Sequence, residues 1–241
     1  DTSSREIFSS LSVSCIRDRL YKGGEGELRD RIRRSDMTAK TVYDFRRLEE
    51  SHHLLLPCKI EEEKETICMS YDLRGMQTLE GIKEADRPVR LALLIAAAEL
   101  EELYLRYEFS LEPENLYYDI LGRVRVKRRD CTLPGGKDRR KEFLRRYQAL
   151  IGYVMDGART YEDYLYGEPE LLTAKEPDAE FFEPETVQEE KKLLVEAYES
   201  CLEHEKKCMK RVERRTYERL VRACTASAIM LVLLIAAFLY I

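Results

Sequence analysis

The last nineteen residues constrain the fold most, because they form one uncharged apolar segment at the end of a charge-rich chain. The segment from Ala223 to Ile241 reads ACTASAIMLVLLIAAFLYI. At a rise of 1.5 Å per residue, a helix of this length is about 28 Å long, close to the ~30 Å hydrocarbon core of a bilayer. A core helix, the alternative, seldom runs so far without a charge. The segment therefore predicts a transmembrane helix over 223–241.

The flank on the N-terminal side of this segment is strongly basic. It holds eight lysines and arginines within seventeen residues: Lys206, Lys207, Lys210, Arg211, Arg214, Arg215, Arg219 and Arg222. The positive-inside rule keeps such a flank in the cytoplasm. The sequence therefore predicts a single-pass protein of the cell membrane, with the lipid bilayer as one partner and a cytoplasmic domain before the span.

About 220 residues precede the apolar segment, enough for one large domain or two small ones. Charged residues make up 36% of the chain, above the ~25% of typical soluble domains, and the net charge is -5. The seven cysteines include no C-x-x-C pair, which favours reduced thiols and no structural disulfide. Because Asp1 comes first and no signal sequence follows it, we expect the numbering to start inside a longer product.

Residues 1–72 predict the smaller part of a mixed domain. A helix is expected over Thr38–Glu50, followed by two strands, Leu54–Ile60 and Thr66–Tyr71, joined by a charged turn. The glycines of Gly23–Gly26 lack the G-x-G-x-x-G order and an obvious strand after them, so they predict a plain turn.

Residues 73–167 predict a mainly helical part. Its expected elements are a helix from Thr78, a long apolar helix from Pro88 to Tyr107, a hairpin of 116–118 with 123–126, a loop at Pro134–Gly136 and a helix from Asp138 to Met155. The apolar run Leu91–Ala98 is followed by three glutamates and is too short to span a membrane, so it belongs to the core.

An acidic, proline-containing linker over 168–188 marks the end of the predicted domain, and a juxtamembrane helix is expected over 189–222. Residues at heptad spacing on that helix are Val195, Tyr198, Leu202, Met209, Val212 and Thr216. This seam is consistent with a homodimeric coiled coil, although Glu205 and Arg219 interrupt it. A helix packed against its own domain explains the same pattern, and both interpretations remain open.

The stretch Glu108–Asp119 reads EFSLEPENLYYD and resembles the catalytic loop of protein kinases, H-R-D-x-K-P-x-N-L-x-x-D. Ser110 stands where that family has its catalytic aspartate, and Glu112 replaces the usual lysine. The position of the metal-binding aspartate falls on Arg128. Of the usual magnesium ligands only Asn115 remains, and its side chain is better explained by hydrogen bonds that hold the loop.

These substitutions predict a protein-kinase-like bilobal α+β domain that is not an enzyme. A serine hydroxyl does not act as a base at neutral pH, and an arginine repels magnesium. We therefore expect a pseudokinase with no cofactor and no metal, followed by a long helix and one transmembrane helix.

Together with the C-terminal helix and the basic-flanked span, the motif Ser110–Asp119 resembles EssB/YukC, the membrane-anchored pseudokinase component of type VII secretion (ESX) systems. The resemblance implies a cytoplasmic pseudokinase domain, one transmembrane helix and an extracytoplasmic helical domain beyond this sequence. It also implies self-association and partners among the other membrane subunits, including the membrane ATPase. The expected function is that of a non-catalytic scaffold in protein transport.

Two other functions compete with this interpretation. A nucleotide-sensing or atypical membrane-bound kinase would need Asp119 or Asp130 to approach the phosphates. A metal-regulated sensor would use Cys201, His204 and Cys208, which share a helical face. The basic runs Arg123–Arg129 and Lys137–Arg146 predict a face for an acidic protein segment and no nucleic-acid binding, because the chain is acidic overall and the runs lack interleaved aromatics.

Overall fold

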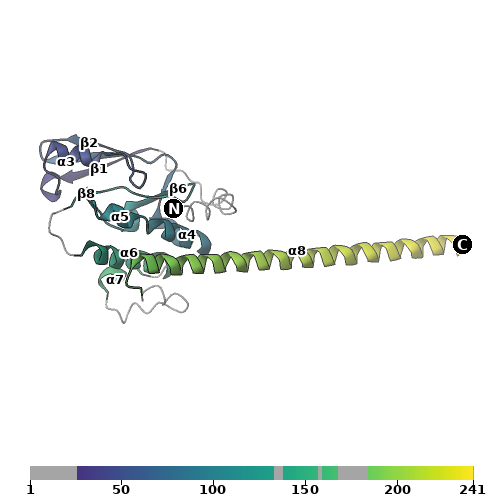
Figure 1. The fold of residues 1–241 in the computed structure, drawn as a ribbon. Coiled ribbons are helices and arrows are strands. Elements are labelled where there is room, and N and C mark those ends of the chain that lie inside the picture. The colour runs from purple at the N-terminus through teal and green to yellow at the C-terminus, as the bar shows by residue number, and fades with distance from the viewer. Residues whose placement is uncertain (1–25, 133–137, 157–158, 168–183, 241) are drawn as a thin grey trace. The chain divides into compact units, whose positions relative to one another are not determined.

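The computed structural model describes residues 26–132, 138–156, 159–167 and 184–240 (Figure 1). Side chains of 209–213 and of 226–240 lie outside this description, as do residues 23–25 of the predicted glycine turn and the Pro134–Gly136 loop. The chain divides into two compact units, Asp1–Tyr198 and Glu199–Ile241. The mixed α+β class predicted from the sequence is confirmed in the first unit.

The first sheet has three antiparallel strands in the order β1 (Glu27–Arg33), β3 (Thr66–Asp72) and β2 (Cys58–Glu62). The central strand β3 is buried from Ile67 to Tyr71, as expected for a strand covered on both faces. The predicted hairpin is confirmed by the pairing of β2 with β3. Strand β1 was not predicted, because charged residues occupy most of its positions and conceal the period-two pattern.

A short helix, α3 (Val42–Leu48), lies in the connection between β1 and β2, which also holds the turn η1 (Arg34–Asp36). Its start is fixed by a capping box in which the Thr41 hydroxyl accepts from the Asp44 amide and the Asp44 carboxylate accepts from the Thr41 amide. The predicted helix was therefore too long at both ends. Phe45 and Leu48 are buried in the core, whereas Val42 is 57% exposed.

The run Leu54–Leu56 is not a strand of the first sheet, and this part of the predicted hairpin was wrong. The Leu56 amide donates to the Val126 carbonyl at 2.9 Å, and the Val126 amide donates to the Leu54 carbonyl at 2.9 Å. These residues make an isolated parallel bridge with the second sheet. Their apolar side chains are buried all the same, which satisfies the same hydrophobic pattern in a different place.

The second sheet has the order β4 (Met76–Thr78), β6 (Leu116–Asp119) and β7 (Val124–Val126). The predicted β6–β7 hairpin is confirmed, and Gly122 has a φ of 73° in its turn, a conformation that favours glycine. A two-stranded pair joins β5 (Tyr107–Glu108) to β8 (Asp130–Cys131). The turn η3 (Pro113–Asn115) leads directly into β6.

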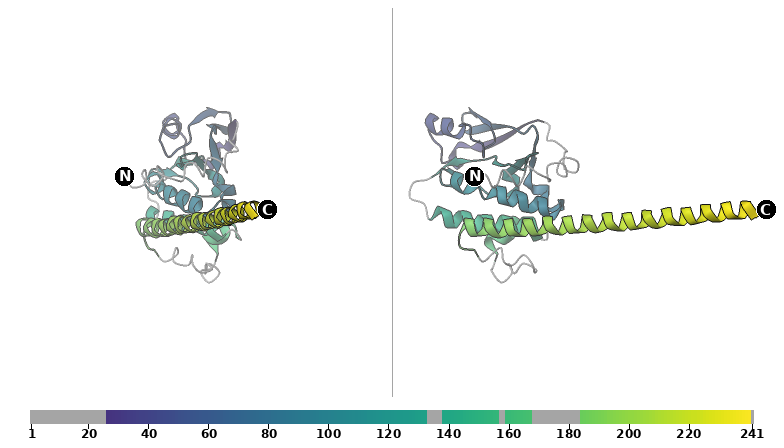
Figure 2. Two further views of the ribbon diagram at one scale, coloured as in Figure 1. Left: turned by 90° about the vertical axis from the view of Figure 1, so that its right-hand side faces the viewer. Right: turned by 45° about the vertical axis from the view of Figure 1, so that its right-hand side comes forward.

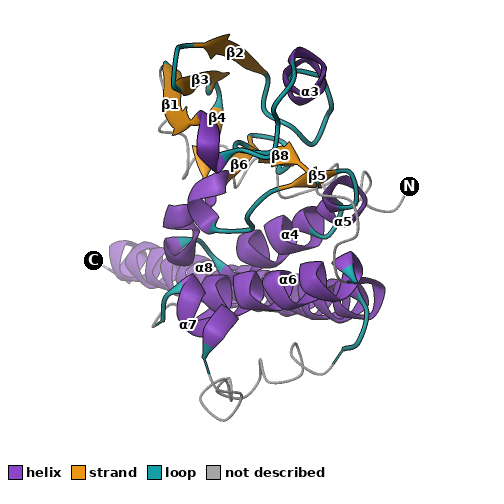
Figure 3. Ribbon diagram, turned by 90° about the vertical axis from the view of Figure 1, so that its left-hand side faces the viewer, coloured by secondary structure: helices purple, strands orange, loops and turns teal. Residues whose placement is uncertain are grey.

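The helical part contains η2 (Leu79–Glu84), α4 (Arg87–Ala97), α5 (Leu100–Tyr104), α6 (Arg139–Asp156) and α7 (Tyr161–Tyr166). Figure 3 shows α4, α6 and α7 gathered on the side of this unit away from β1, β2 and β3. The prediction of a single helix over 88–107 is wrong. The helix is interrupted between α4 and α5, and the last residue of the predicted range belongs to strand β5. The helix expected over 138–155 is confirmed as α6.

The last helix, α8 (Val187–Tyr240), is continuous over 54 residues (Figure 2). Its first turns belong to the compact domain, since Val187, Glu190, Leu194 and Tyr198 recur every three or four residues and are all buried. The first unit therefore ends inside the segment that the sequence assigned to a juxtamembrane helix.

Within the described part of the chain, no helix is both long enough and apolar enough to cross a membrane. Most side chains of the predicted span 223–241 lie outside the described residues.

Candidate functional site

A cleft of about 640 Å³ collects the four positions that the sequence singled out as degenerate kinase residues. Its lining comes from β1 and the residue after η1, from β5 and the loop before β6, from the segment that runs from the end of β7 into β8, and from α6: Arg29, Asp30, Arg31, Ile32, Met37, Glu108, Phe109, Ser110, Glu112, Glu114, Asn115, Lys127, Arg128, Arg129, Asp130 and Arg146. Residues far apart in the sequence thus meet at one place in the first unit.

The Asn115 side chain links two segments of the cleft, one at Ser110 and the other at Arg128. Its Nδ2 donates to the Ser110 carbonyl at 2.9 Å and to the Arg128 carbonyl at 3.0 Å. Its Oδ1 accepts from the Arg128 amide at 2.7 Å. The side chain is buried, so both ends of the amide are used inside the protein. The hydrogen bonds expected for a loop-holding residue are present.

The side chains at the other three positions make few contacts within the protein. The Ser110 Oγ accepts from the Glu112 amide at 3.1 Å, a local turn of the kind that serine makes in loops. Glu112 and Arg128 are exposed at the edge of the cleft. The Arg128 backbone is engaged by Asn115, while its guanidinium is directed by no ion pair among the described residues. This corner of the cleft therefore presents charges of both signs.

Asp130, one of the two carboxylates that the competing kinase hypothesis could bring to the phosphates, accepts hydrogen bonds from backbone amides. One carboxylate oxygen accepts from the Ala39 amide at 2.9 Å and from the Cys131 amide at 2.7 Å, and the other accepts from the Thr38 amide at 2.5 Å. A carboxylate with three amide donors is strongly held in place. Asp130 therefore anchors the segment before α3 to β8.

Asp119, the other carboxylate that this hypothesis could use, also accepts hydrogen bonds within the protein. Its oxygens accept from the amides of Leu121 at 2.9 Å and Arg123 at 3.1 Å, and from the Arg123 Nε at 2.7 Å. The Arg125 guanidinium lies 3.7 Å away. Asp119 is buried at the base of the β6–β7 turn, so it stabilises the hairpin and does not line the cleft.

Arg129 is a central residue of the site that sequence analysis missed. It is 1% exposed, and its guanidinium donates to the carbonyls of Leu48 and Leu56 and to the Cys58 Sγ at 3.1 Å. The side chain thereby ties the end of α3 to the segment before β2. Burial raises the pKa of the Cys58 thiol, and the nearby arginine charge opposes that rise. No local motif predicts such a buried arginine.

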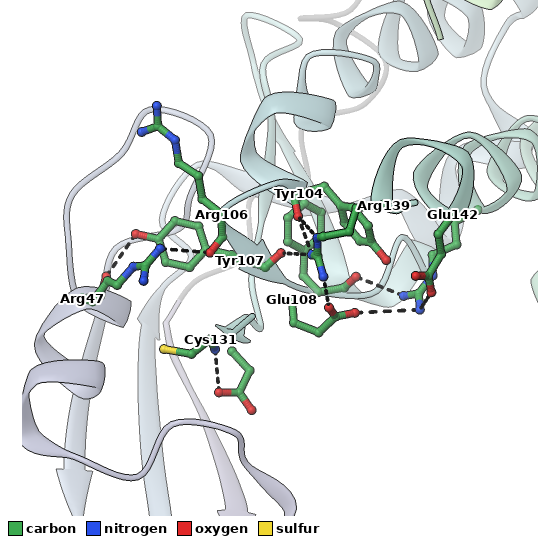
Figure 4. A network of polar contacts seen from close by, with 11 residues as sticks. Arg47, Tyr104, Arg106, Tyr107, Glu108, Cys131, Arg139 and Glu142 are labelled. Atoms are coloured by element: carbon green, nitrogen blue, oxygen red, sulfur yellow. Dashed lines mark hydrogen bonds and ion pairs between the residues drawn. The ribbon is translucent and has the colours of Figure 1, made fainter. Parts of the chain in front are cut away.

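The bases of the two basic runs largely form ion pairs and hydrogen bonds within their own domain. The prediction that these runs make a docking face for an acidic segment must therefore be corrected. Arg139 pairs with Glu108 at 2.7 Å and donates to the carbonyls of Tyr104 and Tyr107 (Figure 4). Its guanidinium lies 4.6 Å from the centre of the Tyr104 ring. Burial raises the pKa of the Tyr104 hydroxyl to about 12.

Other bases of the two runs have similar internal partners. Arg146 pairs with Glu142 at 2.6 Å, and Lys127 pairs with Asp30 at 3.4 Å. Arg140, Lys141 and Arg145 lie on the outer side of α6, where all three are exposed. Only a fraction of the predicted basic face is therefore available to an acidic partner.

Some residues of the predicted dimer seam lie in the first unit and the others lie in the second unit. Tyr198 is buried within the first unit, so its packing is explained by its own chain. Val195 is half-buried there, Leu202 is half-buried in the second unit, and Thr216 is exposed. The side chains of Met209 and Val212 lie outside the described residues. The homodimer stays a prediction for the second unit alone.

The candidate metal ligands lie next to one another on α8 but do not form a cluster of three. The Cys208 Sγ lies 3.8 Å from the His204 Nδ1, which is a contact between side chains one helical turn apart. Over the residues the structure describes, no group of three histidine, cysteine or carboxylate side chains is placed to hold a metal ion.

A family model described as "WXG100 protein secretion system (Wss), protein YukC" matches residues 32–241. The chain belongs to the YukC family. The EssB/YukC resemblance seen in Ser110–Asp119 and in the order of elements is thus confirmed, and it places the chain in the WXG100, or type VII, secretion system. No match to a curated protein was found.

Two crystal structures of EssB cytoplasmic fragments share the fold of this YukC-family chain. The Staphylococcus aureus fragment is 22% identical with a TM-score of 0.60, and the match covers 70% of this chain and 99% of that one. The Geobacillus thermodenitrificans fragment is 14% identical with a TM-score of 0.62, covering 74% and 87%. These likenesses show the fold.

Proposed function

We propose that the chain is a non-catalytic, membrane-anchored scaffold of the type VII secretion machine. In this proposal the kinase-like first unit is a pseudokinase that docks other membrane subunits, including the membrane ATPase, on the cytoplasmic side. The C-terminal part of α8 holds the chain in the cell membrane and pairs with a second copy. Membership in the YukC family supports the secretion role.

The engagement of Asp130 is the observation that carries the non-catalytic part. Magnesium needs several carboxylate or carbonyl oxygens, and kinases supply them from the two positions occupied here by Asn115 and Arg128. The Asn115 side chain is used by Ser110 and Arg128, and the Asp130 carboxylate accepts from three amides. The proton-accepting position holds Ser110, which lacks the required basicity.

The membrane part rests on the sequence. Residues 223–241 carry no charge, and eight bases precede them within seventeen residues. The continuity of α8 across this junction supports the proposal, because a helix satisfies its own backbone hydrogen bonds and needs no further partner in lipid.

A nucleotide-sensing or atypical kinase remains the alternative. In this chain it would require Asp119 to leave the β6–β7 turn, or Asp130 to release the amides of Thr38 and Ala39, which would also free the segment before α3. Such a rearrangement loses charge-assisted hydrogen bonds, so magnesium binding would have to supply several kcal/mol, at about 1.5–3 kcal/mol for each bond. The arrangement favours the scaffold.

Complementation of secretion tests the proposal. In host cells that lack the chain, we expect secretion of WXG100 proteins to stop, and to be restored by Ser110→Ala and Arg128→Ala variants at wild-type protein levels. A variant ending at Arg222 should fail to restore it and should leave the membrane fraction. Loss of secretion in both cleft variants, with normal abundance, would favour the nucleotide-dependent alternative.

A further inference from the structure

Of the bases in the second unit whose side chains the structure describes, two are paired with glutamates of the same helix, whereas those nearest the uncharged segment are not. Lys207 pairs with Glu203 at 3.5 Å, and Arg214 pairs with Glu218 at 3.2 Å, each one helical turn apart. Arg215, Arg219 and Arg222 are exposed, and the structure gives none of the three an ion pair with a described residue. The charges of these three arginines are therefore available to an external partner.

The three available arginines share one face of α8. Their spacing of four and three residues places them within an arc of about 60° at 100° per residue. The large apolar side chains of this stretch lie on the opposite face and are exposed: Tyr217 at 69%, Leu220 at 60% and Val221 at 41%. The arginine face is thus continuous and is not covered by bulky apolar neighbours on the same helix.

This face ends where the uncharged segment begins. Along the axis, Arg222 and Arg219 lie about 1.5 and 6 Å before Ala223, and Arg215 lies about 12 Å before it. The Debye length at physiological ionic strength is about 8 Å, so at least two of the arginines lie within the field of a charged membrane surface at that junction. Guanidinium groups also match phosphate oxygens in geometry and charge.

We propose that Arg215, Arg219 and Arg222 form a binding face for the headgroups of anionic phospholipids. The inference rests on the membrane anchor of the proposed function. It goes further in assigning a lipid class to one face of the helix and in excluding the paired bases Lys207 and Arg214 from that role. An acidic protein segment is the competing occupant, and the position of the face next to the apolar segment favours lipid.

Tryptophan fluorescence can measure the lipid preference directly, because the chain contains no tryptophan. An Ala223→Trp variant places one reporter a single turn beyond Arg219. The full chain is reconstituted in vesicles of equal parts phosphatidylglycerol and phosphatidylcholine, with one or the other lipid brominated. The ratio of quenching gives the local enrichment of the anionic lipid. We expect the anionic lipid to be enriched about fivefold at low salt, which corresponds to the roughly 1 kcal/mol of one well-formed arginine contact. At high salt the enrichment should fall towards unity.

Two double variants of equal charge provide the matched comparison. Arg215→Gln with Arg219→Gln should abolish most of the enrichment, whereas Lys207→Gln with Arg214→Gln should retain it, because those bases are paired with Glu203 and Glu218. Equal losses in both variants would overturn the proposal, since net charge alone would then explain the effect.

The remaining outcomes separate this inference from the proposed function. Equal quenching by both lipids would overturn the lipid face and leave the membrane anchor intact, and the arginines would then belong to an acidic protein partner. Absence of quenching by either brominated lipid would contradict the membrane anchor itself.

Discussion

Asn115 shows at the scale of one residue how a side chain at a kinase-like ligand position can hold a loop together. Three hydrogen bonds link it to the backbone of Ser110 and Arg128. We expect Asn115→Ala to lower the free energy of unfolding by about 2–3 kcal/mol, because it leaves buried backbone groups without partners. Urea unfolding measures this, with Glu114→Ala as an exposed neighbour that should change stability by less than about 0.5 kcal/mol. A neutral Asn115→Ala variant would contradict the structural role.

Glu190 is a second informative residue, since it is 0% exposed on α8. One carboxylate oxygen lies 3.4 Å from the Gln148 Nε2, and the other has no hydrogen-bond partner. The nearby Tyr147 hydroxyl donates to the Leu94 carbonyl, and the adjacent Lys191 lies 3.9 Å from Glu99. Burial raises the pKa of Glu190 from its ordinary 4.5 to about 7, and the Gln148 contact opposes that rise.

A raised native pKa means that the folded state binds this proton more tightly than the unfolded state. The resulting stability is present below pH 4.5 and is lost as the pH rises to about 7. Glu190→Gln keeps the shape and removes the charge, so it should stabilise the chain by up to about 3 kcal/mol at pH 8 and by little at pH 4. Urea unfolding at the two pH values checks this. An equal effect at both pH values would show that folding does not raise the pKa of this carboxyl group.

At the scale of elements, the contact between α6 and α7 depends on the absence of a side chain. A Cβ at Gly152 would overlap the ring of Tyr164, whose hydroxyl is bonded to Asp156. We expect Gly152→Ala to destabilise the chain by about 1–3 kcal/mol and to loosen α7. Gly81→Ala is the matched control, because nothing lies within 4 Å of that added Cβ. Thermal unfolding that ranks the two variants equally would refute this packing.

Elements with a strong apolar period were predicted well, and elements defined by distant contacts were not. Helix α6 and the β6–β7 hairpin follow directly from their side-chain patterns and turn glycine. Strand β1 escaped prediction because its stability comes from pairing with β3 while its own residues are mostly charged. Leu54–Leu56 has strand-like composition, yet Val126 of another sheet provides its hydrogen bonds.

At the scale of the whole molecule, Ser110, Glu112, Asn115 and Arg128 all line one cleft, although no cleft was predicted from the sequence. The contacts that occupy Asp130 and Arg129 were missed as well. Two of the amides that donate to Asp130, and the carbonyls of Leu48 and Leu56 that accept from the buried guanidinium of Arg129, come from segments more than seventy residues away. Sequence spacing carries no information on contacts of that kind. The end of the first unit at Tyr198 has the same cause, since long-range burial decides it.

Binding of ATP to the full chain, measured by calorimetry with and without magnesium, tests the scaffold most directly. With Asp130 and Asn115 occupied by the protein's own backbone, we predict no magnesium-dependent binding at millimolar ATP. Tight binding that requires magnesium would contradict this account, because it would show that the cleft can assemble a metal site, and it would make nucleotide sensing the leading function.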